Sequence, residues 1–113
     1  MKSIKYVYVS GPITGDGSVP REVSCRKAIL VATELIDAGF APFIPHLNLL
    51  WNMLTPRDER TWMEYDLDWV KRCDAVLRVE GPSKGADEEC ALAEMLGIPV
   101  FHRIDEMMQK QPK

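Results

Sequence analysis

One acidic residue, Asp66, lies where a charge is costly. It falls within an apolar stripe at helical spacing, whose other members are Trp62, Tyr65, Trp69, Val70 and Cys73. A carboxylate in such a stripe must be paired or hydrogen-bonded, and groups of this kind are also common in functional sites. Asp66 is therefore either a structural hydrogen-bond partner at the edge of the stripe or an acid that takes part in chemistry.

Glu89 is the second acid of interest. It follows Asp87 and Glu88 at the start of a helix predicted for residues 86–96, and it projects on the same side as Leu92, Ala93 and Leu96. Acids in the first turn of a helix usually only interact favourably with the helix dipole, and each such interaction stabilises the helix by about 0.3–1 kcal/mol. A Glu that faces this positive field beside a crevice would instead stay ionised and accessible, which suits a carboxylate nucleophile. The sequence leaves both interpretations open.

Two loops contain residue types that can bind phosphate. Gly11, Gly15 and Gly17 permit close backbone approach to a ligand, although their spacing is not that of a dinucleotide fingerprint. The turn over residues 83–85 offers the Ser83 hydroxyl and free N–H groups before a helix, so it is either a phosphate cradle or a plain turn. His46 and His102 have no Cys or acid at ligand spacing, so we expect neither a metal site nor a cofactor.

The surrounding pattern alternates strands and helices. Strands are predicted at residues 5–10, 40–45, 75–79 and 98–102, and helices at 20–38, from Thr55 to 73, and at 86–96. Thr55 followed by Pro56 resembles a helix N-cap, and Pro42 places its strand at a sheet edge because proline cannot donate to the ladder. Residues 46–54 are predicted to form a loop with one helical turn.

This alternation indicates an α/β fold over residues 1–113, with a weakly determined tail at 103–113. We expect one doubly wound, flavodoxin- or Rossmann-like domain with about four parallel strands in the order 2-1-3-4 and helices on both faces. Ligands of such sheets bind at the carboxyl ends of the strands. The loops after the first and third strands, residues 11–18 and 81–85, are thus the expected site.

Composition excludes several classes of function. The 113 residues carry 14 Lys and Arg against 17 Asp and Glu, a net charge of -3, so the basic footprint of a nucleic-acid binder is missing. No apolar run reaches the roughly 20 residues that span a bilayer, so we expect no membrane partner. The first residues lack the pattern of a signal peptide, and the three cysteines are an odd number, which together favour a cytoplasmic location.

Three motifs in order resemble the nucleoside 2-deoxyribosyltransferase superfamily, which includes the 2′-deoxynucleoside 5′-phosphate N-hydrolases. Residues 8–13 resemble its first strand and substrate loop, residues 66–70 followed by 74–76 its helix–strand signature, and residues 82–89 its Ser-x-Gly-x-x-x-Glu turn. The resemblance covers most of the chain, from Tyr6 to Phe101.

The resemblance implies cleavage of an N-glycosidic bond through a glycosyl intermediate on Glu89. Asp66 would be the paired acid, and Tyr8 would hydrogen-bond Glu89. The residues expected to bind the small nucleotide or nucleoside are Ser10, Gly11, Ile13, Gly15, Ser83 and Gly85. Ser83 falls where the transferases usually carry Asp and the nucleotide hydrolases carry a phosphate-binding Ser, which favours hydrolysis of a (deoxy)nucleoside 5′-monophosphate.

Two alternatives remain open at this point. Transfer of deoxyribose between bases uses the same covalent intermediate as hydrolysis. A catalytically silent nucleotide-binding or sensor domain is favoured by the acidic run at residues 87–89 and by Ala91, where the family carries Gly.

An apolar segment points to assembly. Its members are Leu47, Leu49, Leu50, Trp51, Met53 and Leu54, more than one short loop needs for its own packing. Such residues are either core or an exposed patch for a partner. Because small domains with apolar patches commonly form closed dimers, we expect a homodimer or larger even oligomer with this segment and the Trp62–Trp69 helix near the contact.

Overall fold

Four short runs of β-branched, aromatic and small residues form one parallel sheet in the order β2-β1-β3-β4. The strands are β1 (Tyr6–Ser10), β2 (Ala41–Phe43), β3 (Ala75–Arg78) and β4 (Val100–Phe101). The computed structural model describes residues 3–13 and 20–111. In its register Tyr8 pairs with Phe43 on one side and with Val76 on the other. The predicted fold class and strand order are confirmed, and β2 with Pro42 lies at an edge.

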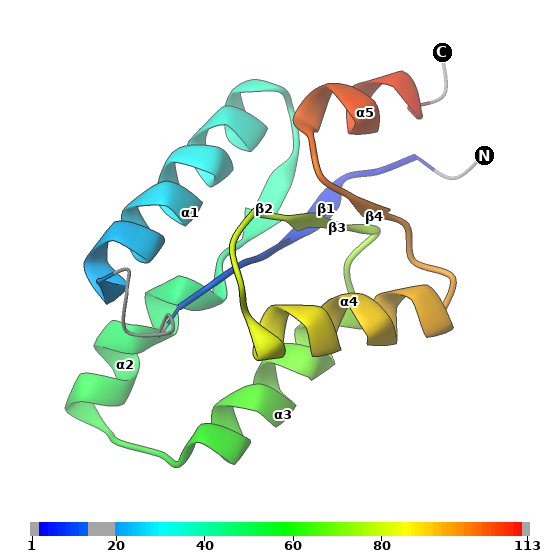
Figure 1. Cartoon of the computed structure of the whole chain (residues 1–113). Coiled ribbons are helices and arrows are strands. Elements are labelled where there is room, and N and C mark those ends of the chain that lie inside the picture. Colours follow the sequence, from blue (N-terminus) through cyan, green and yellow to red (C-terminus); the bar gives the residue numbers. More distant parts are fainter. Residues whose placement is uncertain (1–2, 14–19, 112–113) are drawn as a thin grey trace.

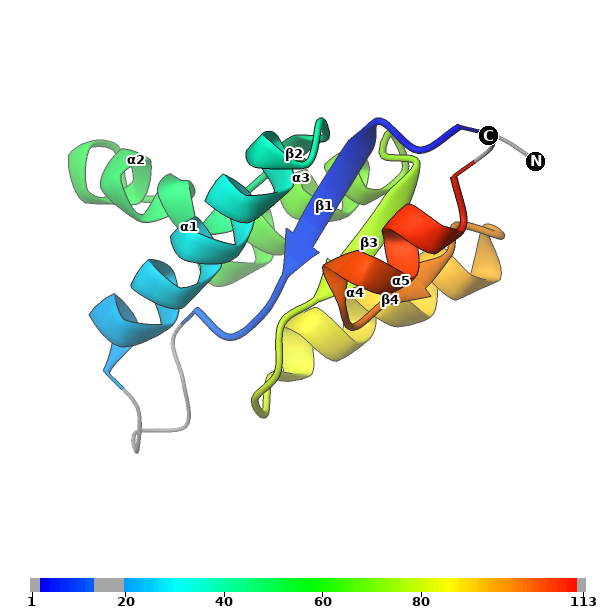
Figure 2. The same cartoon turned by 90° about the horizontal axis from the view of Figure 1, so that it is seen from above.

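Helices cover both faces of the sheet, as Figures 1 and 2 show. Helices α1 (Arg21–Asp37) and α5 (Ile104–Gln109) lie on one face, and α3 (Glu59–Val70) and α4 (Lys84–Met95) lie on the other. Because strand side chains alternate between faces, β1 contributes Val7 and Val9 to the α1 side and Tyr8 to the α3–α4 side. Each face thus has its own apolar core. Within the described ranges, every helix is too short or too polar to cross a bilayer.

Helix α1 buries a narrow stripe of small residues and one leucine. Ser24, Ala28, Ala32 and Leu35 are buried, whereas Ile29 and Ile36 are 41% and 62% exposed. Small residues at the centre of this stripe let the helix approach the sheet closely, and that contact leaves both isoleucines outside. Gly39 follows the helix with φ +96°, a left-handed conformation that favours glycine at the end of a helix.

The segment before α3 is helical, which corrects the predicted loop. Residues Pro45–Leu47 form a 3-10 turn (η1), and Asn48–Leu54 form helix α2. Thr55 does not cap the next helix, because its hydroxyl bonds back to the carbonyl of Trp51. Asp58 caps α3 instead, accepting a 2.8 Å hydrogen bond from the Thr61 N–H, as suits a residue type strong at N-caps.

The tail is more ordered than its polar sequence suggested. Met107 of α5 is fully buried against the sheet. Beyond the helix, the Gln111 side chain donates to the Ile4 carbonyl and accepts from the Ile4 N–H, both at 2.7 Å. The side-chain amide thereby joins the two ends of the described chain.

Candidate active site

Glu89 is buried at the carboxyl end of β1, with one hydroxyl on each carboxylate oxygen. Tyr8 Oη donates to Oε2 at 2.6 Å, and Ser10 Oγ donates to Oε1 at 2.7 Å. Both donors lie on β1, where alternation points residues 8 and 10 to the same face, and α4 brings Glu89 against that face. The Tyr8–Glu89 hydrogen bond expected from the sequence is present.

Burial corrects the expectation that Glu89 is an accessible, readily ionised carboxylate. Its side chain is only 5% exposed. Desolvation raises the pKa of Glu89, and the hydrogen bonds from Tyr8 and Ser10 and the positive charge of Arg78 oppose that rise. Burial, followed by the negative charge of Glu89, raises the pKa of Tyr8, so Tyr8 remains a hydrogen-bond donor.

Asp66 has both a structural hydrogen-bond partner and a place at the candidate site, the two roles that its position in the stripe allowed. It is 6% exposed and accepts a 3.1 Å hydrogen bond from Asn48 Nδ2, so it does have a structural partner. It also lies within the electrostatic range of Glu89. Desolvation and the negative charge of Glu89 raise the pKa of Asp66 to about 7. Two acids on one cavity wall with perturbed pKa values are typical of acid–base chemistry.

A cavity of about 530 Å³ opens beside this pair. Its walls include the predicted residues Gly11, Ile13, Asp66, Ser83, Gly85 and Glu89. The loop after β1 and the turn before α4 therefore meet at one site, as expected for the carboxyl ends of neighbouring parallel strands. A volume of this order lies within the range of small-molecule sites.

One predicted substrate-binding residue of the described chain, Ser10, does not lie on the walls of this cavity. Ser10 is fully buried and its hydroxyl donates to Glu89, so it positions the carboxylate and is not available to a ligand in the cavity. Gly15 falls outside the described residues. Ser83 lies on the wall, and its hydroxyl also caps α4 by accepting from the Ala86 N–H at 3.1 Å.

Three cations on the cavity wall were not anticipated. Arg21 comes from the start of α1, Arg57 from the segment before α3, and Lys84 from the first position of α4. Each belongs to a different element, and only Lys84 lies in a motif that the sequence singled out. Arg21 and Arg57 come to the same cavity only because the chain folds, and no local sequence pattern indicates it.

The loop after β1 is fixed by contacts to its neighbours. The buried His46 ring donates from Nε2 to the Pro12 carbonyl at 3.0 Å. Gly11 lies so close to β3 that a Cβ there would be 2.9 Å from the Cβ of Val79. The sequence identified Gly11 by type, but it carried no signal for His46.

A family model matches residues 5–103, nearly the whole chain. The family is a domain of unknown function, DUF7768. The chain belongs to the DUF7768 family.

One solved structure similar to this DUF7768 domain is a 2-deoxyribosyltransferase from the psychrotolerant bacterium Bacillus psychrosaccharolyticus. The two share 24% sequence identity with a TM-score of 0.59, over 88% of this chain and 75% of the other. This likeness establishes a deoxyribosyltransferase-like fold. The comparison with curated proteins gives no match.

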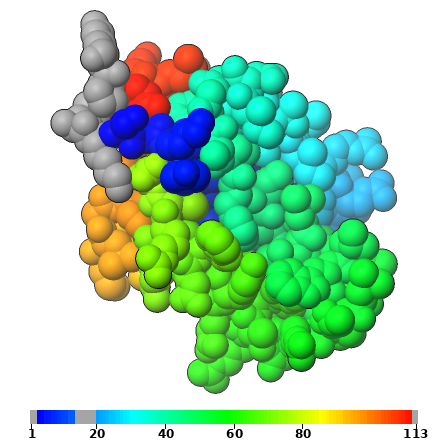
Figure 3. All heavy atoms as spheres, turned by 180° about the vertical axis from the view of Figure 1, so that it is seen from behind, coloured from blue at the N-terminus to red at the C-terminus, as the bar shows by residue number. Residues whose placement is uncertain are grey.

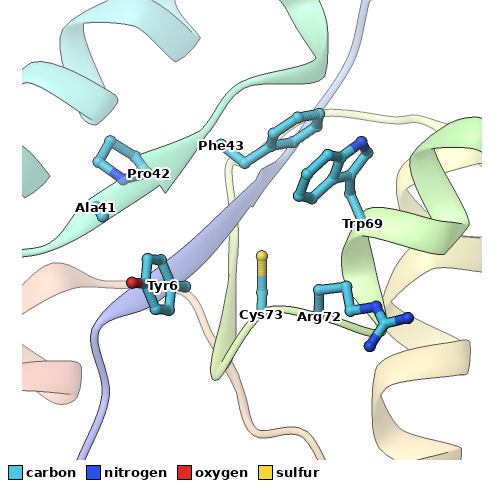
Figure 4. Close-up of a pocket in the computed structure, with 7 residues that line it drawn as sticks. All are labelled: Tyr6, Ala41, Pro42, Phe43, Trp69, Arg72 and Cys73. Carbon is cyan, nitrogen blue, oxygen red and sulfur yellow. The ribbon is translucent and has the colours of Figure 1, made fainter.

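A second, shallower cavity of about 340 Å³ lies at the other end of the sheet (Figure 4). Its walls carry Tyr6, Phe43, Trp69 and Cys73, and the Cys73 sulfur points into the space between the aromatic rings. Phe43 stacks on Trp69 with ring centroids 5.1 Å apart and on Tyr8 at 5.5 Å. Trp69, which belongs to the predicted helical stripe, thus packs on Phe43, and Phe43 in turn packs on the ring of Tyr8.

Proposed function

We propose that this protein cleaves the N-glycosidic bond of a nucleoside or nucleotide by double displacement, with Glu89 as the nucleophile. The observation that carries the proposal is the buried Glu89 carboxylate, held by Tyr8 and Ser10 on the wall of a nucleoside-sized cavity beside Asp66. Two carboxyl groups that flank an oxocarbenium-like centre are the groups that glycoside hydrolysis uses.

In the first step a carboxylate oxygen of Glu89 attacks C1′ of the sugar. The C1′–N bond breaks, and its electron pair goes to the leaving base. Asp66 donates the proton that neutralises the base. The pKa of Asp66, raised to about 7 by burial and by the charge of Glu89, supports this role because a substantial fraction is protonated near neutral pH.

In the second step a nucleophile attacks C1′ and Glu89 leaves as a carboxylate. Asp66, now ionised, accepts the proton of that nucleophile. If the nucleophile is a second base the reaction is deoxyribosyl transfer, and if it is water the reaction is hydrolysis. The fold shared with a 2-deoxyribosyltransferase supports transfer as the leading reaction.

Hydrolysis of a 5′-monophosphate is the second candidate, and the charges of the cavity support it. Arg21, Arg57 and Lys84 supply three cations on the wall, which also carries the acids Glu59, Asp66 and Glu89. Ser83 accepts from the Ala86 N–H, which leaves its own O–H free to donate to a phosphate oxygen. A bare nucleoside has no anionic group that could pair with these cations, whereas a 5′-monophosphate has one.

The experiment that tests the proposal is chromatography of the protein with 2′-deoxynucleosides and with their 5′-monophosphates, each with and without a second free base. We expect base release that requires Glu89. Formation of the second base's nucleoside identifies transfer, and release from the monophosphates alone identifies nucleotide hydrolysis. Tight nucleotide binding with no base release by the folded protein would contradict the proposal and assign a silent binding domain.

A further inference from the structure

Arg78 carries a positive charge that is largely removed from solvent. It is the last residue of β3, and its side chain is 11% exposed. The guanidinium donates to the carbonyls of Val79 and Gly81, the latter at 2.9 Å, and to Asp87 Oδ1 at 3.1 Å. Since arginine does not lose its proton in proteins, this charge is permanent. It lies between the end of β3 and the first turn of α4.

These bonds fix the turn that forms one wall of the cavity. Gly81 has φ +122°, a conformation that side chains rarely adopt, and a Cβ there would lie 2.9 Å from Pro12 Cγ. The carbonyl of the same residue accepts from Arg78. Arg78 therefore also stabilises the contact between this turn and the loop after β1, which His46 holds through Pro12.

Arg78 also acts on Glu89 through its charge. Its positive charge lowers the pKa of Glu89, against the desolvation that raises it. The other groups that interact with Glu89 are the two hydroxyls on β1 and the Asp66 carboxyl on α3. The exposed Glu88 on α4 acts through its negative charge, which raises the pKa of Glu89. Among the described residues whose charge acts on Glu89, Arg78 is the cation that favours the charged form of the carboxyl group.

Asp87 is the acid that meets Arg78. Its side chain is 72% exposed and its carboxylate bonds to Nη2 of Arg78, while neither Asp87 nor Glu88 belongs to the cavity wall. The acidic run before Glu89, which favoured a silent domain, is thus partly neutralised by an ion pair. The pair also reduces the field that Arg78 exerts on Glu89.

We propose that Arg78 and Asp87 form a positioning pair for the Glu89 site: Arg78 holds the cavity turn through its bonds to the Val79 and Gly81 carbonyls, and Asp87 ties that turn to α4 and partly neutralises the charge of Arg78. This inference rests on the proposed role of Glu89 as the nucleophile. It makes Arg78 a positioning residue that never touches the substrate.

The test measures the ionisation of Glu89 directly, by carbon-13 NMR titration of protein labelled at its Glu carboxyls, with Glu89→Gln to assign the signal. We expect Arg78→Met to raise the titration midpoint of Glu89 by about one pH unit and Asp87→Asn to lower it. Glu94→Gln, which removes an exposed acid from the far end of α4, is the matched control and should leave the midpoint unchanged. An unchanged midpoint in both Arg78→Met and Asp87→Asn would overturn the inference.

Kinetics separate positioning from charge. Arg78→Lys keeps the charge but cannot form the fork of hydrogen bonds, so we expect it to raise KM severalfold while the acid limb of the pH profile stays near that of the wild type. An Arg78→Lys enzyme with unchanged KM and kcat would overturn the positioning role. Lack of turnover by the wild type would instead contradict the proposed function, and the NMR titration would still decide the effect of Arg78 on Glu89.

Discussion

The hydroxyl of Tyr8 lies 2.6 Å from Oε2 of Glu89, although the two residues are 81 positions apart in the chain. Ser10, two residues along the same strand, holds the other oxygen at 2.7 Å. A buried carboxylate with a donor on each oxygen is fixed in orientation and can remain charged without water. The proposed chemistry depends on this arrangement.

Tyr8→Phe should weaken both the site and the fold. The change removes one donor from the buried Glu89 but keeps the ring that stacks on Phe43. We expect the free energy of unfolding to fall by about 1–3 kcal/mol and the acid limb of the activity profile to move to higher pH. Tyr6→Phe, on the same strand but 56% exposed, is the control and should change neither in denaturant titrations or pH–rate measurements. Equal stability and equal profiles for the two variants would argue against the hydrogen bond.

The pH dependence of the rate should be bell-shaped, with an acid limb set by Glu89 and an alkaline limb set by Asp66. Glu89 must be ionised to attack, and since burial raises its pKa above 4.5, the rate falls with acid from a point above that value. Asp66 must be protonated to serve the leaving base, so the rate also falls as pH rises through its pKa of about 7. Asp66→Asn should lose the alkaline limb, and its rate should fall by a factor of about 10²–10⁴. An alkaline limb that persists in Asp66→Asn would exclude Asp66 as the acid.

The architecture was predictable from local patterns. Alternating strands and helices, Pro42 at an edge and Gly39 after a helix each follow from short-range chemistry, and all are present. Glu89 and Asp66 were recognised because each placed a charge in an apolar pattern, and both are buried.

Other features arise only from packing between distant segments. Helix α2 has a weak sequence signal because its apolar residues remain largely on the surface, so no periodic stripe is visible. Met107 lies in a polar tail, yet it is fully buried in the apolar core on the α1 side of the sheet. Arg21 and Arg57 reach the cavity from separate elements, and no local motif marks them.

Gly11→Ala should destabilise the site far more than Gly85→Ala. A Cβ at Gly11 would lie 2.9 Å from the Cβ of Val79, an atom that is bonded directly to the backbone just after β3 and cannot move aside alone. At Gly85 the nearest atom, at 3.1 Å, is the terminal methyl of Met63, which can move aside. Thermal unfolding should show a loss of about 1–3 kcal/mol for Gly11→Ala and a smaller change for Gly85→Ala. The reverse order would show that the loop after β1 is not packed as described.

The exposed face of α2 should mediate assembly. Figure 3 shows the α2 region, in green, projecting from the body of the molecule, and its exposed apolar residues are Leu47, Leu50, Trp51, Met53 and Leu54. Trp51→Ala should weaken a homodimer by about 2 kcal/mol, measured as a shift toward monomer in light scattering. Met95→Ala on α4, where Met95 is 80% exposed, is the control for loss of any surface apolar group. A wild-type monomer at tens of micromolar would contradict the assembly.

Mass spectrometry of the acid-quenched protein tests the central claim most directly. The protein is mixed with 2′-deoxynucleosides or their 5′-monophosphates, quenched during turnover and digested. We predict that the peptide containing Glu89 gains the mass of one glycosyl group from the cleaved substrate. Glu89→Gln keeps the size of the side chain but only one of its two acceptor oxygens, and we predict that it gains no adduct and that its rate falls at least about 10³-fold. Base release by a Glu89→Gln protein at the wild-type rate, with no adduct on the wild type, would contradict the account.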